Sequence, residues 1–165
     1  MNLHARKLRA QSAMEYLMTY GWAILIIAVV LGALFSLGVF SSSSLVGTSC
    51  VPLSGYYCAN PVLSTSGTLS LTIGQATGTP YSSVTAYFVP SGSTLNPSTD
   101  PSNTISGGLN SGQTVSVTFN VIGVSGITSN TPLGTALTGQ IWLSYTAGST
   151  SGLETQIATL TVKAS

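Results

Sequence analysis

Residues 9–22 read "RAQSAMEYLMTYGW", and residues 23–40 continue as "AILIIAVVLGALFSLGVF". Residues 16–40 carry no formal charge, and this run exceeds the ~20 residues that a helix needs to cross a bilayer. Its apolar residues would fall on every side of a helix, so that helix must be surrounded by lipid or by other protein. The stretch therefore predicts a long hydrophobic α-helix over residues 11–40, with a lone acid, Glu15, near its beginning.

The few charges of the chain are placed unevenly. Arg6, Lys7 and Arg9 crowd the N-terminus, whereas Asp100 is the only formal charge between residues 16 and 153. The flank that follows the apolar run, "SSSSLVGTSC", has no charge, so the positive-inside rule places the N-terminus in the cytoplasm and the rest of the chain outside. The body of the chain has no basic patch, and we expect no nucleic acid as a specific ligand.

Two cysteines, Cys50 and Cys58, bracket the residues "VPLSGYY". In a chain that looks exported, a pair this close most simply forms a disulfide around a small loop; two unpaired buried thiols are the alternative. The only histidine, His4, lies far from the pair in the sequence. We therefore expect no metal site and no cofactor.

From about residue 60 the hydrophobic pattern changes to a period of two, which is typical of half-buried strands. The turn-rich stretch 90–112 reads as exposed loops with one short edge strand, and 146–154, "TAGSTSGLE", reads as a hairpin loop. Strands are expected in "TLSLTI", "SVTAYFV", "QTVSVTFNVI", "GQIWLSYT" and "ETQIATLTV", with weaker candidates near Val62 and Ile105. Such strands predict an all-β, Ig-like antiparallel sandwich of about 100 residues.

The expected fold class is α+β, a long N-terminal hydrophobic helix followed by this sandwich. Four segments are expected: a basic leader over 1–10, the core or transmembrane helix over 11–40, a linker with the disulfide loop over 41–60, and the β-sandwich over 61–165.

Catalytic residues are scarce in the sequence. General acid–base chemistry needs a histidine or paired carboxylates, and the body of the chain offers only Asp100 and Glu154. Asp100 precedes a proline and reads as a turn former, while Glu154 opens the last expected strand. We expect that the protein is not an enzyme.

The leader "RKLR", the small residue Ala10, the "QSAME" that follows and the apolar helix together resemble the class III signal and core helix of type IV pilins, particularly archaeal ones. The resemblance covers about residues 5–40. In that family a prepilin peptidase cuts before the hydrophobic run, which maps here between Ala10 and Gln11. Glu15 then becomes the fifth residue of the mature chain, where the family typically has glutamate. The loop "CVPLSGYYC" also looks like that of secreted archaeal pilin-like proteins.

The resemblance implies a structural filament subunit that serves adhesion. The new amine of Gln11 would pair with Glu15 of its own or a neighbouring subunit, since an ionised side chain at membrane depth normally has a partner. Repeated head-to-tail contact would give an open helical homopolymer, with the β-domain outside and with prepilin peptidase, the pilus assembly machinery and the membrane as further partners. The precursor would lie in the cytoplasmic membrane and the filament outside the cell. Small residues would allow close helix approach, namely Ala28, Gly32, Ala33 and Gly38.

Other interpretations stay open at this stage. The chain could be a membrane-anchored extracytoplasmic domain that binds a ligand or sugar, or a minor pilin or pseudopilin. Glu15 could be an interfacial residue of an ordinary signal anchor near Arg9. A conventional secretory signal cut near residues 41–44 is less consistent with the sequence. The apolar region of such a signal is ~7–15 residues long, and the uncharged run here is considerably longer. The hydroxyl-rich surface could also carry O-linked sugar.

Overall fold

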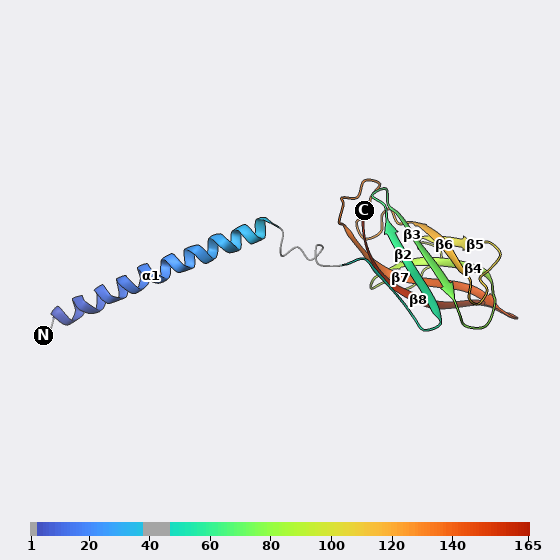
Figure 1. Cartoon of the computed structure of the whole chain (residues 1–165), viewed down its shortest axis with the longest axis horizontal. Helices are drawn as coiled ribbons and strands as arrows, with labels where there is room; N and C mark the ends of the chain where they lie inside the picture. Colours follow the sequence, from blue (N-terminus) through green and yellow to red (C-terminus); the bar gives the residue numbers. More distant parts are fainter. Residues whose placement is uncertain (1–2, 38–46) are drawn as a thin grey trace. The chain divides into compact units, whose positions relative to one another are not determined.

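The computed structural model describes residues 3–37 and 47–165, with side chains from Met14 onward. The chain divides into two compact units, Met1–Ser44 and Leu45–Ser165. The first holds helix α1 (Leu3–Ser36), and the second holds eight strands in two antiparallel sheets (Figure 1). The expected α+β class, a hydrophobic helix followed by a β-sandwich, is confirmed.

Helix α1 differs from the predicted span of 11–40 at both ends. It begins at Leu3, so most of the expected leader is continuous with it; the leader is rich in Leu, Ala, Arg and Lys, which are strong helix formers. It ends at Ser36, where the Ser36 hydroxyl and the Leu37 amide both donate to the carbonyl of Ala33 at 2.8 and 3.0 Å. The remainder of the predicted span, residues 38–40, lies outside the described residues.

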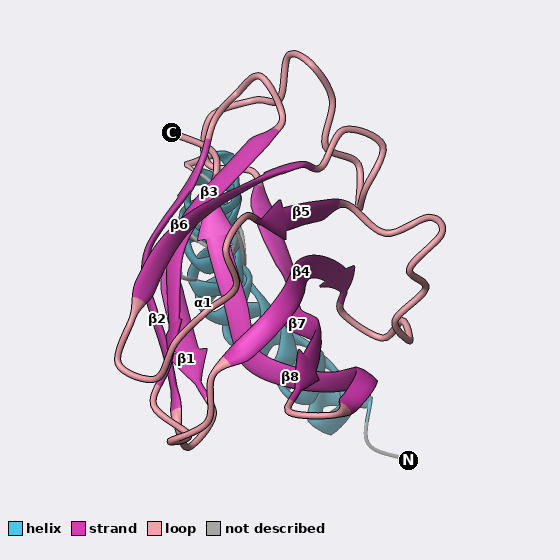
Figure 2. Ribbon diagram, turned by 90° about the vertical axis from the view of Figure 1, so that its right-hand side faces the viewer, coloured by secondary structure: helices cyan, strands magenta, loops and turns pink. Residues whose placement is uncertain are grey.

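The sandwich consists of a five-stranded and a three-stranded sheet (Figure 2). All neighbouring strands in both sheets pair antiparallel. The larger sheet has the order β1 (Ser49–Pro52), β8 (Thr150–Lys163), β7 (Ala136–Ala147), β4 (Tyr81–Pro90), β5 (Ser102–Ile105), and the smaller has the order β2 (Tyr56–Leu63), β3 (Thr68–Gln75), β6 (Thr114–Asn120).

The strand order is Ig-like. If the strands from β2 onward are lettered A to G, the small sheet reads A-B-E and the large sheet contains G-F-C, as in immunoglobulin domains. The fourth of these strands, β5, pairs with β4 instead of β6, and β1 adds an edge beside β8. The Ig-like expectation is therefore confirmed, with one strand moved to the other sheet and one strand added.

The five strands predicted from alternation are confirmed as β3, β4, β6, β7 and β8. In each of them the predicted apolar phase faces the space between the sheets, where it forms one core. Its buried members include Leu69, Leu71, Ile73, Val84, Ala86, Phe88, Val117, Phe119, Ile141, Leu143, Leu160 and Val162.

The weaker sequence patterns predicted the strands and loops less completely. The candidates near Val62 and Ile105 are confirmed as β2 and β5. The predicted nine-residue hairpin loop at 146–154 is wrong, because β7 and β8 continue to a two-residue connection, Gly148 and Ser149. Gly148 has φ 59°, and a glycine with positive φ at the first central position is typical of a type II′ turn.

The expected linker over 41–60 also needs correction, because β1 and five of the eight residues of β2 lie within it. The segment "SCVP" is short and shows no regular alternation of burial, so its sequence pattern did not reveal a strand. The disulfide between Cys50 and Cys58 is confirmed, with Cα atoms 5.8 Å apart, and the alternative of two free thiols is wrong. Because β1 and β2 belong to different sheets, this bond fastens the two sheets together at one side.

A cluster of tyrosines also connects the sheets. Tyr81 of β4 stacks on Tyr145 of β7 with ring centroids 3.9 Å apart, and its hydroxyl lies 3.3 Å from that of Tyr56 on β2. Burial and the bond to Tyr81 raise the pKa of Tyr56 well above its usual range. Burial also acts to raise the pKa of Tyr81, but hydrogen bonds from Thr77, Tyr56 and Tyr145 outweigh it, so that pKa is lowered. The cluster joins β2 to β4 and β7 of the large sheet, whereas the disulfide joins β2 to β1.

Removing the disulfide should destabilise the sandwich. The bridge spans a sequence separation of eight residues, and chain-entropy arguments assign a loop of that size about 2–3 kcal/mol. We expect the double variant Cys50→Ala/Cys58→Ala to lose about that much free energy of unfolding in urea, measured on the full chain in detergent.

Reductant provides the matched control for this change. It should destabilise the wild-type chain by a similar amount and leave the double variant unchanged. Equal stability of the wild-type chain with and without reductant would show that the bond does not hold the sheets together.

Candidate assembly helix

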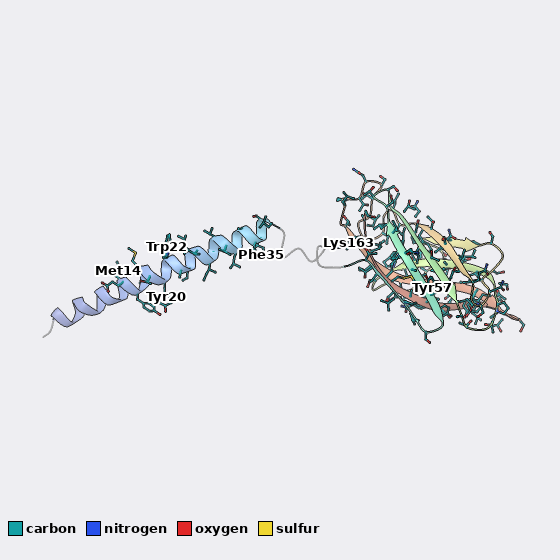
Figure 3. The ribbon with its side chains drawn as sticks, viewed as in Figure 1. Met14, Tyr20, Trp22, Phe35, Tyr57 and Lys163 are labelled. Atoms are coloured by element: carbon teal, nitrogen blue, oxygen red, sulfur yellow. A yellow bond between two sulfur atoms is a disulfide. The ribbon has the colours of Figure 1, made fainter. Side chains whose placement is uncertain are left out.

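Helix α1 presents an apolar surface on all sides. Met14–Ser36, a segment of 23 residues, contains an 18-residue window with a mean hydropathy of 2.3 and is the one segment of the described residues long and apolar enough to cross a membrane. Its large side chains are exposed, for example Leu17 (66%), Trp22 (66%) and Phe35 (67%) (Figure 3). Apolar area of this extent requires lipid or other protein around it. By length and composition, the helix fits a membrane anchor or a signal.

Glu15 lies at the beginning of this apolar segment, one residue after Met14, and its side chain is exposed. The backbone carbonyl of Glu15 accepts a hydrogen bond from the Thr19 hydroxyl at 3.0 Å, so the polar group of Thr19 is satisfied within the helix. Among the side chains that the structure describes, none forms an ion pair or hydrogen bond with the Glu15 carboxylate. A carboxylate that enters a membrane or a protein core therefore needs a partner from elsewhere.

The predicted processing residues lie one turn before this acid. Ala10 and Gln11 belong to the backbone of α1, as do Arg6, Lys7 and Arg9. The side chains of these five residues fall outside the described ones. Gln11 precedes Glu15 by four residues, a spacing that places both on one helix face about 6 Å apart along the axis. An amine at residue 11 would therefore come within reach of the Glu15 carboxylate.

The small residues proposed for helix packing lie on two faces of α1. At about 100° per residue, Ala28 and Gly32 share a face with Gly21. Ala33 follows Glu15 by 18 residues, about five turns, and so lies on the face of the acid. The fourth predicted packing residue, Gly38, lies outside the described residues.

The two helix glycines have open space beside them. A Cβ added at Gly21 or Gly32 would meet no atom within 4 Å, so no part of the described chain uses the space that glycine leaves. Glycine in a helix interior costs about 1 kcal/mol relative to alanine. Small residues of this kind let another helix approach closely in a membrane, and the face of Ala28 and Gly32 is where we expect such a contact.

Aromatic residues gather in the same part of the helix. The rings of Tyr16 and Tyr20 lie 4.2 Å apart, tilted by 32°, and Trp22 follows. Tyr and Trp are enriched where a transmembrane helix meets the polar edge of a bilayer. Their position near Glu15 is consistent with a role as interface or packing residues.

The remaining acids of the chain serve local structure or face solvent. The Asp100 carboxylate accepts the amide of Asn96 at 2.7 Å, which confirms its expected role in a turn. Glu154 is exposed on β8. Within the described residues, no group of three or more His, Cys, Asp or Glu could hold a metal ion.

Comparisons with known proteins give no relative. No protein-family model matches the chain, and no curated protein matches it. The helix, the residues around Glu15 and the properties of the sandwich are therefore the features that bear on function.

Filling the space at Gly32 should weaken association between helices without harming the helix itself. We expect Gly32→Leu to raise helix propensity slightly and to weaken self-association in lipid vesicles about tenfold, which corresponds to ~1.4 kcal/mol and lies within the range measured for contacts between membrane helices. Energy transfer between donor- and acceptor-labelled chains measures this.

Ala23→Leu is the matched control, because it adds volume on the opposite face of the same helix. This variant should associate like the wild-type chain. If both variants associate equally well, or lose association equally, the face of Ala28 and Gly32 is not the contact.

Proposed function

We propose that the protein is the structural subunit of an extracellular filament of the archaeal type IV pilus kind. The subunits polymerise through their N-terminal helices, and the β-sandwiches form the outer surface. The observation that carries this proposal is an apolar segment of 23 residues, exposed on every side and opened by the single acid Glu15. The resemblance of residues 5–40 to class III signals points the same way.

The precursor would first use α1 as a membrane anchor. A segment of 23 residues is about 34 Å long at 1.5 Å per residue, enough to cross a hydrocarbon core of about 30 Å. Arg6, Lys7 and Arg9 would hold the N-terminus in the cytoplasm. The sandwich would then lie outside, where a disulfide such as Cys50–Cys58 persists.

Cleavage between Ala10 and Gln11 would convert the anchor into an assembly element. It removes the three leader cations and creates an α-amine with a pKa of about 7.7–8.0, four residues before Glu15. An amine and a carboxylate 4 Å apart attract by about 4 kcal/mol where the effective dielectric constant is about 20. This pairing lets the acid leave water or the headgroup region when the helix joins its neighbours.

The surface of the sandwich suits the outside of a filament. Its formal charges are Asp100, Glu154 and Lys163, and the rest of its polarity comes largely from Ser, Thr, Asn and Gln. Hydroxyls and amides are hydrated without titrating, so such a surface changes little with pH. Open head-to-tail assembly of helices with these domains outside gives a fibre and not a closed ring.

A second candidate, a monomeric membrane-anchored binding domain, is favoured by the fit of α1 to a single bilayer crossing. In that case the chain would remain with the membrane fraction and form no fibres. A minor pilin would form part of a fibre but would be scarce in purified material. The proposal assigns no catalytic activity to the chain.

Replacing the acid tests the proposal. We expect Glu15→Ala and Glu15→Gln to abolish or strongly reduce filaments in sheared surface material seen by electron microscopy, because the new amine loses its partner. The variant chains should still be found in the membrane fraction.

The other glutamate of the chain supplies the control. Glu154→Ala removes an exposed carboxylate from the sandwich and should leave filament yield unchanged. Normal filaments from Glu15→Ala would remove this residue from the assembly mechanism, and an absence of fibres in the wild-type chain would favour the monomeric anchor.

A further inference from the structure

Four side chains form a row across the large sheet. Trp142 of β7 pairs with Tyr87 of β4 on one side and with Gln156 of β8 on the other. Tyr87 pairs in turn with Ser102 of β5. Directly opposite residues in antiparallel strands have Cβ atoms about 4.5–5.5 Å apart, so the indole and the phenol stand side by side near the middle of the sheet.

The row lies on the face that points away from the core. Tyr87 is flanked along β4 by Ala86 and Phe88, both fully buried, whereas Tyr87 itself is partly exposed. Trp142 is likewise partly exposed between buried neighbours on β7. Two large aromatic side chains therefore occupy the polar phase of their strands, where Ser, Thr and Gln are otherwise usual in this chain.

One hydrogen bond orients the Trp142 side chain within the row. The Trp142 indole N–H donates to the side-chain carbonyl of Gln140 at 3.0 Å, which fixes both groups and turns the Gln140 amide N–H₂ away from this bond. In the described part of the chain, that N–H₂, the Tyr87 hydroxyl and the Gln156 amide have no hydrogen-bond partner. Two aromatic rings are thus bordered by neutral donors and acceptors that a ligand can use.

The charges near the row restrict the ligand. Glu154 lies one row further along β8, where it pairs with Ser144, and Lys163, the other charged residue of this face in the described strands, lies at the far end of β8 opposite Ala136. Lys163 pairs six residues along β7 from Trp142, about 20 Å at 3.3 Å per residue, so an anionic ligand or a nucleic acid finds no counter-charge beside the two rings among the described residues. A ligand that suits the row is neutral, with flat apolar faces for the rings and polar groups at its edges for the amides.

We propose that Tyr87, Gln140, Trp142 and Gln156, here called the aromatic platform, bind neutral carbohydrate chains. The C–H face of a pyranose lies on the indole and phenol rings, and its hydroxyls bond to the two amides. The platform belongs to the sandwich alone, so this proposal does not depend on filament formation, and under either candidate function it names the class of surface to which the protein attaches.

Tyr57 provides a matched control aromatic. It is 48% exposed on β2, in the other sheet (Figure 3). It pairs with Gly74, so no amide or second ring lies opposite it across that pair. A carbohydrate should therefore not select it.

Tryptophan fluorescence offers a direct readout. The chain has two tryptophans, Trp22 and Trp142, so Trp22→Phe leaves the platform as the sole reporter. We would titrate this full chain in detergent with α-mannan, dextran, a soluble β-glucan and a galactan, using anionic heparin as the counter-example. A saturable spectral shift with at least one neutral polysaccharide, and none with heparin, is expected.

Variants then locate the site. Affinity electrophoresis through the bound polysaccharide should show about tenfold weaker binding for Trp142→Ala and for Tyr87→Ala, a loss of the size expected for one aromatic contact. Gln140→Ala and Gln156→Ala alter partly exposed residues and should also weaken binding, which covers the case in which an aromatic variant fails to fold. Tyr57→Ala should bind like the parent chain.

Several results would overturn the proposal. These are the absence of binding to all four neutral polysaccharides, an equal loss with Tyr57→Ala, or full binding by Trp142→Ala. Light scattering that shows a dimer dissolved by Trp142→Ala would identify the platform as a contact between copies of the chain. If replacing Trp142 leaves filament formation normal but abolishes polysaccharide binding, the platform serves binding and not assembly.

Discussion

The exclusion of α1 from water is the constraint on which the rest of the molecule depends. Each fully buried Leu, Ile, Val or Phe side chain gains about 1.5–3 kcal/mol over exposure to water, and Met14–Ser36 offers such side chains on every face. A helix with no polar stripe has apolar side chains to cover on every side. In the proposed filament it exchanges one apolar surrounding for another, lipid for neighbouring helices, and Glu15 is the single charge of Met14–Ser36 that has to follow it.

The sandwich is stabilised by contacts within itself. Its core is shared by two sheets, and it is fastened by the Cys50–Cys58 bond between β1 and β2. The tyrosine cluster around Tyr81 also joins the two sheets, from β2 to β4. The sandwich carries few charges that could repel neighbours or titrate, which would suit the crowding of many such domains on the outside of the proposed fibre.

The sequence predicted secondary structure where every second side chain is apolar, as in the strands, or where nearly every side chain is, as in α1. The helix and the alternating strands such as β3 and β6 were predictable because burial leaves a local period. Strand β1 was not, because its partners lie more than a hundred residues away, as in the pair Ser49 and Thr161. The aromatic platform was missed for the same reason: Tyr87 and Trp142 become neighbours only through the register of β4 and β7. The one available signal was an aromatic residue in the polar phase of each strand.

Glu15 was identified from the sequence because a lone acid before a long apolar run stands out locally, but its proposed partner exists only after cleavage. Mass spectrometry of the N-terminal peptide from sheared extracellular material tests this account most directly. The account predicts a chain that begins at Gln11, with Glu15 as its fifth residue. A chain that begins near residue 42, after the apolar run, would contradict it, because the helix would then have been discarded as an ordinary secretory signal.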